Sequence, residues 1–109
     1  MIISNEPGYY EEGEYGIRIE NLLVVEEVKT QNRFGDRPYL GFRPMTFVPI
    51  QTELIDLEML TSSEQKWIDE YHAEVREKIL PRITETDVRD WLIRNTQPLS
   101  LVASESHQR

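Results

Sequence analysis

The sequence predicts an α+β fold in which a β-rich first part is followed by a small helical part. Two observations predict it. Residues 1–48 are rich in glycine, proline and aromatic residues and alternate in the manner of strands, whereas residues 61–95 are densely charged and have helical spacing. Because the composition changes within residues 49–60, we expect two domains, residues 1–48 and residues 49–109.

The first part predicts short strands separated by turns. Residues 1–4 are apolar and precede Pro7-Gly8, which predicts a buried strand that a turn ends. Residues 15–25 carry apolar side chains on both faces of one alternating strand, as in the interior of a sheet. Residues 31–38 read as a loop, and residues 43–50, interrupted by two prolines, predict an edge strand or an irregular connection.

The second part predicts two helices. Thr61 and Glu64 have the spacing of a capping box, and the apolar residues that follow recur every three or four positions until Pro81: Ile68, Tyr71, Val75 and Ile79. A second helix is expected from Thr84 or Thr86 to Asn95. Residues 99–109 are polar, which predicts a frayed tail.

Charge and composition exclude several classes of function. The chain has 109 residues, 20 acidic and 12 basic, so its net charge of -8 argues against nucleic acid or an acidic membrane surface as a partner. It has no cysteine, which excludes a disulfide scaffold, a thiolate zinc site and a cysteine nucleophile. The longest apolar run, residues 22–25, is far too short for a membrane span.

Two carboxylates stand out from the other acidic residues. Glu6 ends an apolar strand, and Glu20 lies within another, where an unpaired ionised carboxylate is costly to bury. Arg18 is two residues before Glu20 and shares its face, so a lateral salt bridge is one interpretation. The other is that Glu6 and Glu20, on neighbouring strands, converge on a divalent cation.

The histidines suggest no site of their own. His72 flanks the apolar stripe of the first helix without a second histidine nearby, which favours a surface or interface side chain. His107 lies in the polar tail, where a precise geometry is hard to hold.

Two motifs carry a resemblance to a known family. The sequence ISNEPGYY of residues 3–10 and GIRIEN of residues 16–21 resemble the last two metal-binding segments of the aminopeptidase P and prolidase group of pita-bread metallopeptidases. FRPMTFVPIQT of residues 42–52 and WLIRNTQP of residues 91–98 resemble the C-terminal extension of cytosolic-type Xaa-Pro aminopeptidases. The resemblance implies the terminal strands of a pita-bread catalytic domain followed by a small helical C-terminal domain.

The resemblance also implies a chemistry. Family members hydrolyse an N-terminal Xaa-Pro peptide bond with a binuclear site, usually manganese, held by two aspartates, a histidine and two glutamates. By motif, Glu6 is the fourth ligand with a role in proton transfer, and Glu20 is the bridging fifth. Arg18 would orient the metal-binding carboxylates, and Tyr10 would lie near the same site. The implied partners are a peptide with proline in second position and a second copy of the protein, and the implied location is the cytoplasm.

The chain departs from the family at its start. In the family, the aspartates and the histidines of the site precede the position of Glu6, and this chain begins five residues before it. We therefore expect a C-terminal fragment, with Met1 an internal methionine, that is inactive alone and associates through strand edges and helices. The alternatives are a non-catalytic dimerisation or interaction module, a pseudoenzyme of the same fold, and an acidic α+β domain with two structural carboxylates. The presence of both Glu6 and Glu20 argues against the pseudoenzyme.

Overall fold

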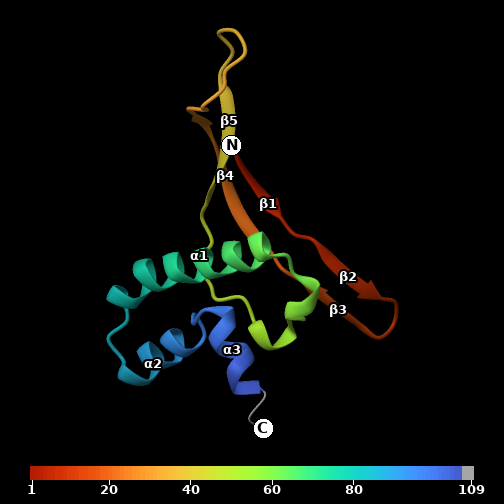
Figure 1. The fold of residues 1–109 in the computed structure, drawn as a ribbon, viewed down its shortest axis with the longest axis vertical. Coiled ribbons are helices and arrows are strands. Elements are labelled where there is room, and N and C mark those ends of the chain that lie inside the picture. The colour runs from red at the N-terminus through yellow and green to blue at the C-terminus, as the bar shows by residue number, and fades with distance from the viewer. Residues whose placement is uncertain (107–109) are drawn as a thin grey trace. The chain divides into compact units, whose positions relative to one another are not determined.

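The structure, a computed structural model, describes residues 1–106, so the predicted tail position of His107 lies outside it. The chain divides into two compact units, Met1–Thr46 and Phe47–Arg109. The first is built from strands and the second from helices, which confirms the predicted α+β class (Figure 1). Among the described residues, no helix combines the length and the apolar character that crossing a membrane requires.

The first unit holds two antiparallel sheets. Its strands are β1 (Ile2–Asn5), β2 (Gly8–Glu11), β3 (Tyr15–Arg18), β4 (Asn21–Val28) and β5 (Tyr39–Pro44). One sheet has the order β1-β4-β5, and the other pairs β2 with β3. β4 is therefore the internal strand, as its two apolar faces predict.

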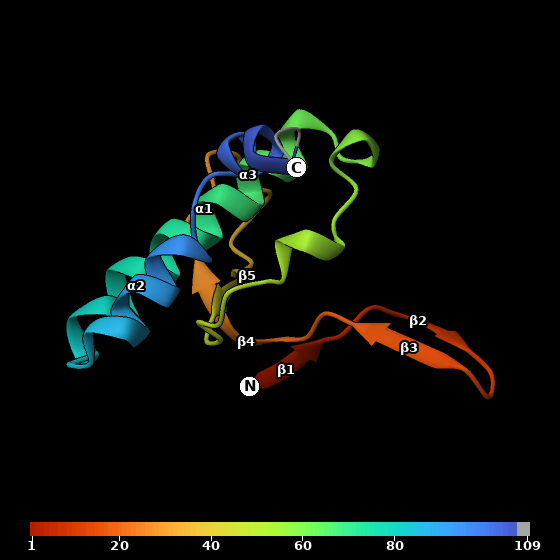
Figure 2. The same ribbon diagram turned by 90° about the horizontal axis from the view of Figure 1, so that it is seen from below.

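The two sheets share one continuous register. β1 pairs with β4 so that Asn5 lies opposite Asn21, and β2 pairs with β3 so that Gly8 lies opposite Arg18. Between them, the Ile19 N–H donates to the Pro7 carbonyl oxygen at 3.2 Å. Pro7 has no N–H to complete that pair, so the ladder is interrupted there. The result is one long hairpin with a gap, visible as β1 leading into β2 and β3 leading into β4 (Figure 2).

Two strand predictions are corrected by this arrangement. The alternating segment 15–25 is two strands, not one, because the ladder is interrupted at Ile19 and Glu20. The first strand is present but not buried: β1 is an edge strand, and Ile2 is 59% exposed. The segment 43–50 is mostly irregular, since β5 ends at Pro44, which confirms the irregular connection that was one of its two interpretations.

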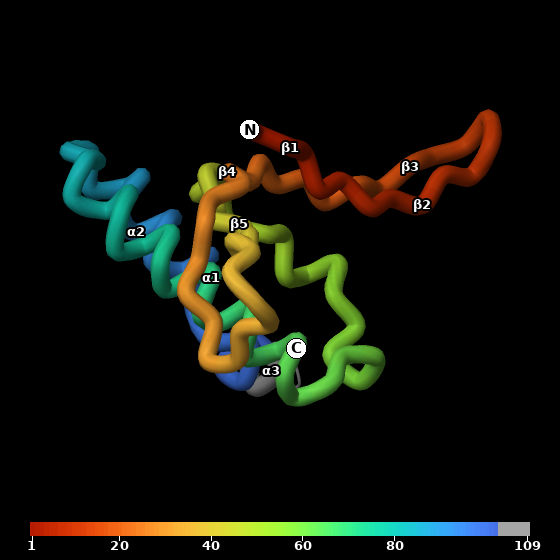
Figure 3. Tube along the Cα trace, turned by 90° about the horizontal axis from the view of Figure 1, so that it is seen from above, coloured from red at the N-terminus to blue at the C-terminus, as the bar shows by residue number. Residues whose placement is uncertain are grey.

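The second unit begins with a long connection and continues as three helices. The connection contains two short 3-10 turns, η1 (Thr52–Leu54) and η2 (Leu57–Met59), and Figure 3 traces it in yellow-green. The helical elements that follow are α1 (Ser62–Ile79), the 3-10 turn η3 (Leu80–Arg82), α2 (Thr86–Arg94) and α3 (Leu99–Ser106). The predicted capping box is confirmed: Glu64 N–H donates to Thr61 Oγ1, and Thr61 N–H donates to Glu64 Oε2 at 2.8 Å.

The core of this unit lies between α1 and α2. Tyr71, Val75 and Leu92 form its buried cluster, and partly buried apolar residues surround it: Phe47, Ile50, Ile79, Leu80 and Ile83. α3 contradicts the predicted frayed tail. Leu99 is buried, and its N–H donates to Asp69 Oδ1 at 2.9 Å, so the start of α3 is attached to α1.

His72 is also corrected, because it is fully buried rather than on the surface. Its Nε2 accepts the Ile50 N–H at 2.9 Å, while the neighbouring Tyr71 hydroxyl donates to the Val48 carbonyl at 2.7 Å and accepts the Val48 N–H at 3.2 Å. Two adjacent side chains of α1 thus bind alternate residues of an extended segment, as a strand partner would. Burial lowers the pKa of His72 and keeps the ring neutral, which the acceptor role requires.

Candidate functional site

The interruption of the long hairpin brings the two predicted carboxylates face to face. Glu6 lies between β1 and β2, and Glu20 lies between β3 and β4. The register on both sides of the gap places them opposite each other. Two like charges in that relation repel, so a cation placed between them stabilises the arrangement.

Arg18, at the end of β3, supplies one positive charge to both carboxylates. Its Nη1 lies 3.8 Å from Glu6 Oε2, and its Nε lies 3.6 Å from Glu20 Oε2. All three side chains are about half exposed, and pairs of this length and exposure stabilise a fold only slightly. One guanidinium balances one of the two carboxylates, so a net negative charge is left at the gap.

Tyr10 lies at the same place. Tyr10 is the foremost cause that raises the pKa of Arg18, followed by the charges of Glu20 and Glu6. The structure therefore brings together all four residues that the resemblance pointed to. Their roles in chemistry stay predictions.

Ser4 is a member of this cluster that sequence reasoning missed. Its Oγ donates to Glu6 Oε1 at 2.6 Å, on the oxygen that Arg18 does not contact. The spacing of two residues along a strand puts Ser4 and Glu6 on one face, so the alternation that grouped Arg18 with Glu20 would have found it.

The carboxylates of Glu6 and Glu20 are ligands of the type that a divalent cation takes, but there are only two of them. Carboxylate oxygens are the ligands that hard cations such as manganese take. Within residues 1–102, however, no three or more His, Cys, Asp or Glu side chains are grouped in a way that could hold a metal. Glu6 and Glu20 alone are therefore too few to hold a metal ion.

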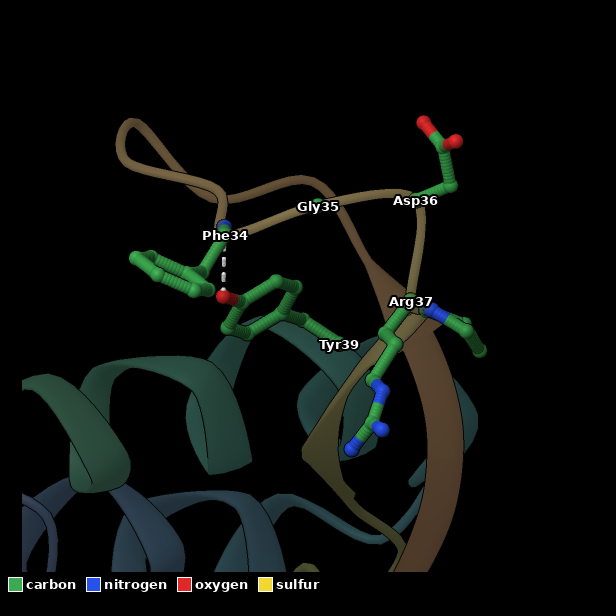
Figure 4. A pocket seen from close by; sticks show the side chains of 6 residues that line it. Phe34, Gly35, Asp36, Arg37 and Tyr39 are labelled. Atoms are coloured by element: carbon green, nitrogen blue, oxygen red, sulfur yellow. Dashed lines mark hydrogen bonds between the residues drawn. The ribbon is translucent and has the colours of Figure 1, made fainter.

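A hollow lies in the loop between β4 and β5. It is lined by one continuous stretch, residues 34–39, and the Phe34 N–H donates to the Tyr39 hydroxyl at 2.7 Å (Figure 4). The Asp36 side chain points away from the two aromatic rings (Figure 4). A single loop with no paired carboxylates and no histidine carries no catalytic arrangement, so the gap of the long hairpin is the candidate site.

Comparison with known proteins assigns the chain to a family. Residues 38–99 match the family described as the C-terminal region of peptidase_M24. The chain is 54% identical over 101 residues to a probable Xaa-Pro aminopeptidase P of Coprinopsis cinerea, covering 91% of the chain and 16% of that protein. It is 52% identical over 100 residues to aminopeptidase P2 of Arabidopsis thaliana, covering 92% of the chain and 14% of that protein.

A solved structure agrees with the sequence relatives. The crystal structure of an X-prolyl aminopeptidase from Caenorhabditis elegans, described as a cytosolic enzyme with a di-nuclear active site, superposes with a TM-score of 0.77 at 34% identity. The match covers 89% of this chain and 16% of that one, so the chain spans a small part of the proteins it resembles. The predicted resemblance is confirmed, and the chain belongs to the peptidase_M24 family, as the C-terminal region found in Xaa-Pro aminopeptidases.

Proposed function

We propose that this chain is the C-terminal part of a metal-dependent Xaa-Pro aminopeptidase that removes the first residue from peptides with proline in second position. The observation that carries the proposal is the placement of Glu6 opposite Glu20 at the interruption of the hairpin, with Arg18 forming an ion pair with each of them. Residues 1–48 would complete the catalytic domain, residues 49–109 would form the C-terminal helical domain, and the enzyme would act in the cytoplasm.

In this proposal the two glutamates are two of the five ligands of a binuclear manganese site. Glu6 also accepts a proton during hydrolysis, and Arg18 holds both carboxylates in place through its two ion pairs. When bound, two cations lower the pKa of a water and stabilise negative charge that develops on a peptide carbonyl. The net negative charge at the gap favours their binding.

The metal assignment is tested by substitution in the full-length protein. We expect Glu6→Gln and Glu20→Gln each to lower both manganese content and Xaa-Pro hydrolysis by more than about 100-fold, since each removes a ligand charge. Glu26→Gln is the matched control: Glu26 also pairs with an arginine, Arg43, at 2.9 Å, but lies outside the gap. Normal manganese content in both site variants would refute the assignment.

The isolated chain gives a second test. With two of five ligands, it should show no turnover of an Xaa-Pro peptide in the presence of manganese. Turnover that Glu6→Gln abolishes would show that the site is complete without other residues. An inactive full-length protein that still self-associates would instead favour the alternative of a non-catalytic interaction module or pseudoenzyme.

We also infer that the second unit forms a homodimer. Exposed apolar side chains lie on α1 and α2: Trp67, Val88 and Trp91. Their burial between copies would be favourable and only weakly dependent on salt. Sedimentation of the 109-residue chain at low micromolar concentration should show a dimer or larger species. A monomer at both low and high salt would contradict this.

A further inference from the structure

Two glycines face the candidate site on the β2–β3 hairpin. In the register of this hairpin, Gly8 lies opposite Arg18, and Tyr10 lies opposite Gly16. Since side chains alternate between faces, these four residues share one face of the hairpin. The two glycines occupy one diagonal, and Tyr10 and Arg18 occupy the other.

The Tyr10 side chain fills the space that the glycines leave. A Cβ on Gly16 would lie 2.7 Å from Tyr10 Cδ1, and a Cβ on Gly8 would lie 2.6 Å from the Tyr10 hydroxyl oxygen. The ring therefore starts over Gly16 and runs back along β2, so that its hydroxyl ends beside Gly8. Because Gly8 is opposite Arg18, the hydroxyl ends next to the point where the Arg18 side chain leaves the strand.

Backbone conformation does not explain either glycine. Within residues 1–106, positive φ occurs only at Gly13 and Gly35, so Gly8 and Gly16 have dihedral angles that any residue adopts. A glycine inside a strand costs about 0.5–1 kcal/mol relative to alanine. What requires glycine at both positions is the space for the Tyr10 ring.

We propose that Gly8 and Gly16 are positioning residues: together they form a cradle that lays Tyr10 across the hairpin, so that its hydroxyl fixes Arg18 between Glu6 and Glu20. This inference rests on the proposed function, in which Arg18 orients two metal ligands. A purely structural role is the competing explanation, because an aromatic ring packed over a cross-strand glycine also stabilises a hairpin.

Two variants separate these roles in the full-length protein. Tyr10→Phe keeps the ring on the glycines and removes only the hydroxyl, so a structural role predicts unchanged manganese affinity. The cradle predicts a loss of about 10-fold or more, typical of residues that hold metal ligands in place. Gly16→Ala should cause a similar loss, because the new Cβ displaces the ring. Unchanged manganese affinity in Tyr10→Phe would refute the proposal.

A double-mutant cycle tests whether Gly16 acts through the ring. In a Tyr10→Ala background, Gly16→Ala should cause no further loss of manganese affinity, because the ring it displaces is absent. Additive losses of manganese affinity would refute the proposed cradle. Gly41→Ala is the matched control, since its Cβ would lie 2.7 Å from Val28 Cγ1 on β4 and away from Arg18. It should change stability without changing manganese affinity.

One readout is independent of metal and activity. In the 109-residue chain, the NMR signal of the Arg18 Nε–H should be shifted from those of exposed arginines, and Tyr10→Phe and Gly16→Ala should each move it toward them. A signal that neither variant moves would refute the cradle. If the signal moves as expected and the full-length protein has no manganese-dependent hydrolysis, then only the proposed function fails.

Discussion

The two units of the chain differ in how far they bury their apolar side chains. Among residues 1–102, whose burial the structure describes, all of the buried residues lie in the helical second unit: Ile68, Tyr71, His72, Val75, Leu92, Thr96 and Leu99. In the strand-built first unit, large apolar residues such as Ile2 and Phe42 are more than half exposed. The unit that carries the candidate site therefore has little core of its own, while the other unit closes its own core.

The polar interactions of the two units also differ in burial. In the second unit, buried or partly buried side chains bind distant backbone groups: Arg76 Nη1 donates to the Thr96 carbonyl at 2.7 Å, and Arg89 Nη1 donates to the Leu80 carbonyl at 2.7 Å. In the first unit, the side-chain ion pairs are exposed. Hydrogen bonds to charged groups stabilise more when water is excluded, so the second unit should be the more stable.

The largest expected difference concerns one leucine in each unit. Leu92 is 2% exposed, and Leu92→Ala should cost about 2–5 kcal/mol of unfolding free energy through lost contacts and a cavity. Leu40 on β5 is 63% exposed, and Leu40→Ala should stay within about 0.5 kcal/mol. Denaturant unfolding followed by circular dichroism measures both. Both tryptophans, Trp67 and Trp91, lie in the second unit, so their fluorescence reports on it alone. Equal losses of unfolding free energy in the two variants would contradict the conclusion that only the second unit has a packed core.

His72 should make the stability of the second unit depend on pH. Burial, the foremost cause, holds the pKa of His72 below its ordinary value; Asp69 opposes this effect and Arg76 adds to it. As pH falls, the unfolded chain therefore takes up the proton first, so the stabilisation is complete above a pH of about 6.5 and is lost below it.

Substitution isolates this contribution. His72→Leu leaves the partly buried Ile50 N–H without its acceptor, which should cost about 1–3 kcal/mol. His72→Gln can accept the same N–H and does not titrate, so it should remove the pH dependence that the tryptophan fluorescence reports. A wild-type unfolding free energy that is the same at neutral and mildly acidic pH would contradict the assignment.

The smallest expected effect belongs to the first unit. Arg43 and Glu26 form its shortest ion pair, 2.9 Å between Nε and Oε2, yet both side chains are about half exposed. A double-mutant cycle with Arg43→Met and Glu26→Gln should give a coupling of about 0.2–1 kcal/mol. The coupling should fall further at about 1 M salt, where the Debye length is only about 3 Å. A coupling energy larger than the loss caused by His72→Leu would show that the first unit, and not the second, has the stronger polar interaction.

The sequence predicts the parts of this fold that depend on local signals. The capping box at Thr61 and Glu64 locates the start of α1, and Pro81 follows its end closely. The break at Ile19 was not predictable, because alternation continues through it and only the missing N–H of Pro7, on the partner strand, interrupts the ladder. Burial of His72 was not predictable either, since nothing in its own helix shows that the Ile50 N–H needs an acceptor.

The candidate site likewise has residues that the sequence predicts and residues that it does not. Its motifs identify Glu6, Glu20, Arg18 and Tyr10 from sequence, although their roles stay predictions. The contributions of Gly8 and Gly16 depend on cross-strand register, which no single strand reveals. A glycine two residues from Tyr10 on one strand, and another two residues from Arg18 on the next, have meaning only after the strands are paired.

The binding of an extended segment by two side chains of α1 has a consequence for hydrogen exchange. Val48 and Ile50 flank Pro49, and their amides lie outside every helix and strand of the structure. Each donates to a side chain of α1, one of them fully buried. These two amide protons should therefore exchange with solvent only when α1 and the core around Val75 open, on the timescale of the second unit as a whole. In an exchange map, the protected region of that unit would begin well before its first helix.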